Sequence, residues 1–158
     1  MDGPKCMDTH PSYHRLFDQV KSLRRFDCFV PCTPVPKQSV QMGSGTFFTP
    51  PRQARYVKFL KKKFKEEYGV RPLFSGNISV KIVYVFPFRK QDRGLESLGW
   101  IPHVQIPDFD NLTKPVLDSL RGSVVQDDRI VFHSEILKVR AKKPGVFVSV
   151  RLCRILRV

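Results

Sequence analysis

The apolar side chains of residues 52–68 recur at the spacing of an α-helix, and this stripe constrains the fold more than any other feature. The stripe consists of Tyr56, Phe59, Leu60, Phe64 and Tyr68. Lysine and arginine fill most of the remaining positions, and Gly69 follows where a helix ends in a left-handed cap. A helix with one apolar stripe needs a second layer to cover that stripe, so the chain is expected to fold in layers.

The segments around this helix have the composition and alternation of strands. We expect strands at 26–30, 46–49, 78–88, about 130–140 and 146–154, with a turn at 41–45 leading into the second strand. A second, short helix is expected to end at Leu120. The order is roughly β-β-α-β-α-β-β, which is typical of an α+β fold, a single domain with two main helices packed against one mixed β-sheet.

Residues 1–24 are expected to form an N-terminal extension to a domain that spans residues 25–158. Apolar residues in the extension, from Tyr13 to Leu23, recur at helical spacing and predict a short helix over 12–24. The longest apolar run covers only residues 82–86, whereas a membrane span needs about 20 residues. The N-terminus also lacks the apolar core of a signal peptide. We therefore expect a cytoplasmic protein with no membrane partner.

The charge of the chain indicates the class of partner. The sequence has 28 Lys and Arg against 14 Asp and Glu, a formal net charge of +14, which attracts polyanions such as nucleic acid. A basic protein that is merely soluble is the alternative. The candidates for DNA contacts are Lys37, Gln38, Arg52, Arg55, Lys58, Lys61 and Lys62. For the helix lysines, a solvated face is an equally good interpretation.

The acidic residues are concentrated in one segment of this basic chain. Five of the 14 lie between residues 108 and 128, namely Asp108, Asp110, Asp118, Asp127 and Asp128. In an extended backbone, Asp108 and Asp110 would place both carboxylates on one side of the chain. Carboxylates held so close repel each other unless a cation or proton lies between them. Mg²⁺ is bound by one or two carboxylates together with water and phosphate oxygens, so the pattern fits a magnesium site.

A proline predicts where the second helix begins. Pro115 is tolerated in a first helical turn, so the helix should begin near residues 112–114 with Thr113 as a cap. Lys114 and Asp118 are then one turn apart and can pair. A turn at 122–123 could return Asp127 or Asp128 to the first two carboxylates. Such a cluster suits metal-assisted phosphodiester hydrolysis, with the lysine stabilising developing charge or assisting proton transfer. The alternative is that these aspartates are only caps and turn residues.

The residues of this segment resemble a known family. Residues 107–120 read PDFDNLTKPVLDSL, and Gly122 and then QDDRIV at 126–131 follow. This pattern is similar to the PDxDNLxKxxxDAL segment, glycine and DD pair of the RusA family of Holliday-junction resolvases. The PVPKQ sequence at 34–38 also resembles the PxPKxR segment of many phage members. The resemblance covers about residues 27–152.

The resemblance implies a homodimeric, Mg²⁺-dependent endonuclease that nicks four-way DNA junctions symmetrically in recombination and repair. Mn²⁺ is expected to substitute for Mg²⁺, and no organic cofactor is expected. By position, Asp108, Asp110 and Asp128 match metal-binding catalytic aspartates, and Lys114 matches the catalytic lysine. Asp127 is a further metal-ligand candidate, and Asn111 and Asp118 are supporting residues. The sequence departs from the family pattern at Ser119, at Gln126 and at Gln38–Ser39, where the expected Arg is missing. None of these residues is a proposed metal ligand.

Two other functions fit the same residues. One is a nuclease for flaps, forks or other branched DNA that uses the same aspartates. The other is a junction-binding protein without catalytic activity. Cut sites on junction, flap and linear duplex distinguish the first of these from a resolvase, and nicking of any kind excludes the second.

Overall fold

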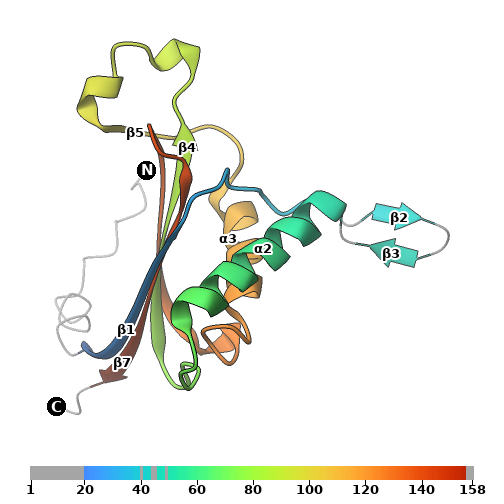
Figure 1. Cartoon of the computed structure of the whole chain (residues 1–158), viewed down its shortest axis with the longest axis vertical. Coiled ribbons are helices and arrows are strands. Elements are labelled where there is room, and N and C mark those ends of the chain that lie inside the picture. The colour runs from blue at the N-terminus through green and yellow to red at the C-terminus, as the bar shows by residue number, and fades with distance from the viewer. Residues whose placement is uncertain (1–19, 40, 44–45, 49, 156–158) are drawn as a thin grey trace, which may run out of the picture.

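The computed structural model describes residues 20–39, 41–43, 46–48 and 50–155 (Figure 1). Along the chain the strands are β1 (Val20–Val30), β2 (Gln41–Gly43), β3 (Thr46–Phe48), β4 (Ile78–Pro87), β5 (Trp100–Pro102), β6 (Val131–Ala141) and β7 (Gly145–Ile155). The α-helices are α2 (Pro51–Tyr68) and α3 (Phe109–Leu120). Three short 3-10 turns are η1 (Lys90–Asp92), η2 (Glu96–Leu98) and η3 (Asp128–Ile130).

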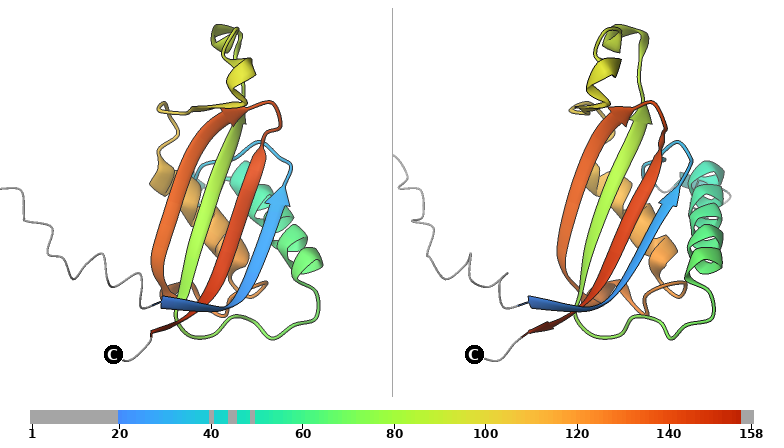
Figure 2. Two further views of the ribbon diagram at one scale, coloured as in Figure 1. Left: turned by 90° about the vertical axis from the view of Figure 1, so that its left-hand side faces the viewer. Right: turned by 60° about the vertical axis from the view of Figure 1, so that its left-hand side comes forward.

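Five of the strands form one mixed sheet in the order β1-β7-β4-β6-β5, and β2 and β3 form a separate hairpin. Strands β4 and β6 are parallel, and the other neighbours in this sheet are antiparallel. Both helices cover the same face of the sheet, and no other described element covers the opposite face (Figure 2). The α+β prediction, with two main helices on a mixed sheet, is therefore confirmed for the described residues.

The core lies between the sheet and the two helices. Alternate residues of β4, from Ile78 to Phe86, are buried and belong to one apolar cluster with side chains of both helices. The helix members include Leu60, Phe64, Leu112, Val116 and Leu120, none of which is exposed. The amphipathic helix is confirmed over its whole predicted length, and Gly69 ends it with a φ of 69°. Phe59 is an exception within the predicted stripe, because it is exposed, whereas Gln53 is buried.

Several predicted boundaries are wrong, and long-range pairing explains most of them. Residues 20–24, predicted as the end of a helix over 12–24, belong to β1, where Val20 pairs with Ile155. Ten paired positions between β1 and β7 outweigh a local helical spacing. Residues 12–19 lie outside the described part. Residues 41–43, predicted as part of a turn, form the first arm of the β2–β3 hairpin.

The long loop after β4 contains short elements of its own. It projects beyond the end of the sheet and carries η1, η2 and β5 (Figure 1). Strand β5 returns to pair with the C-terminal end of β6. Within the described residues, no helix is both long enough and apolar enough to cross a membrane.

Candidate active site at the start of α3

The first two predicted ligands lie where α3 begins. Asp108 is the N-cap residue with extended backbone, and Asp110 lies in the first helical turn. Both residues are exposed. Asp108 makes no side-chain cap hydrogen bond, and no hydrogen bond or ion pair is found for either carboxylate. These two carboxylates are therefore free to bind a cation, at the helix end where anionic groups are favoured.

The predicted start of α3 is wrong. The helix begins at Phe109, and Pro115 lies inside it rather than in its first turn. Thr113 is not a cap, because its hydroxyl donates to the Phe109 carbonyl at 2.6 Å within the helix. Asp108 and Asp110 consequently do not share an extended segment. The helix tolerates Pro115 because another part of the chain supplies the missing hydrogen bond: the Lys37 amide donates to the Asn111 carbonyl at 2.6 Å.

Lys114 joins the helix to the second acidic segment. Its ammonium lies 3.0 Å from an Asp118 oxygen and 3.1 Å from an Asp128 oxygen. Hydrogen bonds to Asp118 and then Asp128 raise the pKa of Lys114 above its ordinary value, so the side chain stays protonated. Asp110, Lys114 and Asp118 follow each other at four-residue intervals and therefore lie on one face of α3. The predicted Lys114–Asp118 pair is thus present. Asp128 reaches α3 at Lys114, and its return to Asp108 and Asp110 stays a prediction.

Asp127 has a different environment from Asp128. The Arg129 amide and Nε both donate to one Asp127 oxygen at 2.9 Å, and these bonds lower the pKa of Asp127. This carboxylate caps η3 and pairs with a cation already present in the chain. We therefore leave Asp127 out of the ligand set proposed below.

The basic candidates divide into two groups by position. Arg52, Arg55, Lys58, Lys61 and Lys62 are exposed along α2. This helix packs beside α3, with the Ser119 hydroxyl bonded to the Val57 carbonyl at 3.3 Å (Figure 2). Lys61 lies near Gly122, just past the C-terminal end of α3, where a positive charge also stabilises the helix. Lys37 and Gln38 belong to the separate segment that is hydrogen bonded to both helices.

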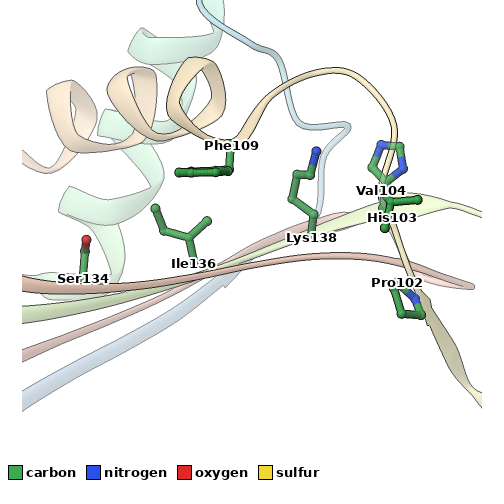
Figure 3. A pocket seen from close by; sticks show the side chains of 7 residues that line it. All are labelled: Pro102, His103, Val104, Phe109, Ser134, Ile136 and Lys138. Atoms are coloured by element: carbon green, nitrogen blue, oxygen red, sulfur yellow. The ribbon is translucent and has the colours of Figure 1, made fainter. Parts of the chain in front are cut away.

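One residue of the site is absent from the sequence-based predictions. Lys138 of β6 donates to the carbonyls of Gln105 at 2.8 Å and Pro107 at 2.6 Å, and so holds the backbone directly before Asp108. Figure 3 shows Lys138 in a pocket of about 390 Å³, between Phe109 and His103. The strand pattern could have indicated this role. Lys138 and Arg140 lie two and four residues after the inward-facing Ile136, so all three side chains are on the same face of the sheet. Charged residues at core-facing positions usually have a specific partner.

The donor chemistry of the site fits a hard divalent cation. Asp108 and Asp110 supply free carboxylate oxygens, and one oxygen of Asp128 is bound to Lys114. Within the part of the chain described, no three His, Cys, Asp or Glu side chains converge as a ready-made metal group. Two carboxylates are sufficient for Mg²⁺, which keeps several waters and uses phosphate oxygens of the substrate.

Carboxylates at a helix N-terminus, a fixed lysine and a basic neighbouring helix fit the class of nucleases, which act on a phosphodiester. The family model for the endodeoxyribonuclease RusA matches residues 30–151. The chain therefore belongs to the RusA family and is a DNA endonuclease of the Holliday-junction resolvase type. Nucleases of this family are metal-dependent and act on DNA. No curated protein matches the chain.

Proposed function

We propose that this resolvase uses Mg²⁺, with Mn²⁺ as a substitute, and cuts four-way junctions by paired symmetric nicks. The observation that carries the assignment of the site is the position of Lys114. Its ammonium is held by Asp118 and Asp128 on the same helix face as Asp110. The proposed ligands are Asp108, Asp110 and Asp128. A bound Mg²⁺ neutralises the scissile phosphate and activates a water molecule.

The side chains of the chain have separate roles in this proposal. Asp108 and Asp110 bind the cation because, among the described residues, neither carboxylate has a hydrogen bond or an ion pair. Lys114 stabilises negative charge that develops on the phosphate, since it stays protonated and its position is fixed at two points. Asp118 orients Lys114, and Asn111 anchors the Lys37 segment through its carbonyl.

The basic residues bind the DNA backbone around the cut. Arg52, Arg55, Lys58, Lys61 and Lys62 form an exposed basic surface on α2, beside the helix that carries the acidic residues. Lys37 and Gln38 extend this surface to the start of α3. Such phosphate contacts give affinity that depends on salt and carries no sequence information.

The open face of the sheet supports a homodimer. Phe29, Phe147, Val83 and Leu137 are paired in register across four strands on the side opposite the helices. Phe29 remains 45% exposed and Leu137 42% exposed. Two ion pairs lie beside this apolar row, Arg25 with Asp27 and Lys81 with Glu135, together with Arg151, which is opposite Arg25. A face with an apolar centre fits a second copy of the chain better than DNA, and a two-fold dimer places two sites on a two-fold symmetric junction.

The proposal is tested by cleavage of end-labelled synthetic junctions, one immobile and one partly mobile, with and without Mg²⁺. Flap and linear duplex are the controls for substrate. We expect paired nicks at symmetric positions that require Mg²⁺. The Asp110→Asn variant should bind the junction as the wild type does and lose cleavage, because the amide removes a ligand charge but keeps the shape. Cleavage that persists in this variant would contradict the site, and cutting confined to flaps would contradict the substrate.

A further inference from the structure

Pro115 leaves one carbonyl of α3 without its helical partner. In an α-helix the amide of residue 115 would donate to the carbonyl of Asn111, and proline has no amide hydrogen. The Asn111 carbonyl instead accepts the Lys37 amide at 2.6 Å. Pro115 itself is buried. The Asn111 carbonyl, which lacks its helical hydrogen bond, thus binds the segment around Lys37.

The next amide of that segment is held by the other helix. Gln38 donates its amide to the Gln53 side-chain oxygen at 2.8 Å. Gln53 is 7% exposed and lies in the first turn of α2. Two consecutive amides are therefore bound by two different helices, so residues 37–38 lie across the N-terminal ends of α2 and α3.

The rest of the segment contains few other means of holding its backbone. Residues 33–39 have no regular secondary structure, and Pro34 and Pro36 have no amide hydrogen to donate. Burial of Val35 anchors the segment before Lys37. The two amide bonds consequently determine where the Lys37 backbone lies, which is at the first turn of α3 with Asp108 and Asp110.

We propose that Pro115 and Gln53 are positioning residues for Lys37, and that Lys37 so placed contacts the phosphate that is being cleaved. The inference rests on the proposed function of the same site. It explains why a buried proline occupies the middle of the helix that carries the acidic residues: the unused Asn111 carbonyl binds Lys37, whose positive charge then faces the substrate together with Lys114. A lysine fixed at its backbone loses less conformational entropy when it binds phosphate than one in a loose loop.

The central variant is Pro115→Ala, which restores an amide that competes for the Asn111 carbonyl. The helix should become no less stable, since alanine is a far better helix former than proline. We expect an unchanged or higher Tm, and a kcat for junction cleavage about 10- to 100-fold lower, because small misplacements of reacting groups have effects of that order. Junction affinity should change less than about threefold, since many phosphate contacts remain. Pro51→Ala is the matched control, because the amide of a first helical residue has no helical partner.

Gln53 provides an independent pair of variants. Gln53→Met keeps the size of the side chain and removes the acceptor, so kcat should fall as it does in Pro115→Ala. Gln53→Glu keeps an acceptor at a helix N-terminus that favours negative charge, so activity should be restored to near the wild-type value. Equal losses in the methionine and glutamate variants would contradict the positioning role of Gln53.

A double-mutant cycle tests whether both residues act through Lys37. Lys37→Met should lower kcat at least as much as Pro115→Ala does, and the double variant should be no slower than Lys37→Met alone. If the fold-reduction of kcat in the double variant equals the product of the two single reductions, the inference is overturned. A wild-type kcat in both Pro115→Ala and Gln53→Met would also overturn it. Hydrogen exchange of the Lys37 and Gln38 amides is a readout independent of cleavage: the Lys37 amide should exchange faster in Pro115→Ala. If the wild type does not cut junctions, the proposed function fails, while unchanged amide exchange would overturn the positioning by itself.

Discussion

At the scale of single residues, Lys114 shows how the chain supplies a permanent positive charge beside an acidic site. Two carboxylates hold its ammonium at 3.0 and 3.1 Å, and both contacts favour the protonated form. The pKa of Lys114 therefore lies above its ordinary value of 10.5, and the residue is unsuited to accepting a proton near neutral pH. Of the two roles considered for this lysine, stabilisation of developing charge is the one its environment favours.

Replacing Lys114 should consequently impair the chemical step. In Lys114→Gln we expect kcat to fall by about 100- to 1,000-fold, as when one stabilising donor is removed from an active site, with junction affinity nearly retained. The pH profile of the wild type should show no loss due to Lys114 until the pH exceeds about 10, because a raised pKa keeps the charge up to that point. Single-turnover cleavage across pH measures both effects. A basic limb near pH 8 that disappears in Lys114→Gln would contradict this role.

At the scale of elements, the loop between β4 and α3 is tied to the sheet at its base. Arg140 of β6 is buried and donates to the Pro87 carbonyl at 2.9 Å, and its other nitrogen lies 3.1 Å from Nδ1 of His103. Burial, followed by the positive charge of Arg140, lowers the pKa of His103 to about 4. His103 is therefore neutral at physiological pH and accepts a hydrogen bond from Arg140.

This arrangement makes stability depend on pH in a defined direction. The unfolded chain binds a proton on His103 below about pH 6.5, whereas the folded chain does so only below about pH 4. The contribution of His103 to the free energy of unfolding is thus complete above pH 6.5 and is lost as the pH falls toward 4. Between pH 6.5 and pH 4 the free energy of unfolding should decrease less in His103→Gln than in the wild type, by roughly 1 to 3 kcal/mol. Urea unfolding at pH 7, 5.5 and 4.5 measures the difference, and parallel pH profiles for the two proteins would contradict it.

At the scale of the whole molecule, the two faces of the sheet have different surroundings. One face is covered by α2 and α3 (Figure 2). The exposed side chains of α2 are mostly Lys and Arg. The other face has an apolar row with two ion pairs beside it. The proposed DNA-binding surface and the proposed dimer surface are therefore separate, as the proposed action of a dimer on a single junction requires.

A charge in the apolar row should separate association from folding. In Leu137→Asp we expect a monomer by light scattering, because the dimer would bury an unpaired carboxylate. The variant should retain its fold, since Leu137 is already 42% exposed in the single chain. On four-way junctions, this variant should cut more slowly and make single nicks instead of paired ones. Val70→Asp is the matched control, a fully exposed apolar residue after α2 that should leave association unchanged. A dimeric Leu137→Asp protein with paired nicking would exclude this face as the interface.

Local patterns were reliable where a physical rule acts between near neighbours. The stripe of α2, its end at Gly69 and the alternation of β4 were all predictable, because helix and strand periodicities depend on nearby residues. Local rules were unreliable where a contact from a distant part of the chain changes the outcome. Pro115 predicts a helix start by the local rule, whereas the structure places it inside α3, where the Lys37 amide satisfies the carbonyl that proline leaves unpaired.

The fold class, the family and the set of acidic residues near one lysine are predictable from the sequence, since they follow from local periodicity, charge and a continuous motif. Which of those acidic groups are free and which are already paired depends on the tertiary structure. Asp127 is bound to Arg129, Asp128 reaches Lys114, and Lys138 holds the backbone before Asp108. The contacts of Asp128 and Lys138 depend on how β6 is placed by its pairing with β4, a long-range arrangement that no local spacing encodes.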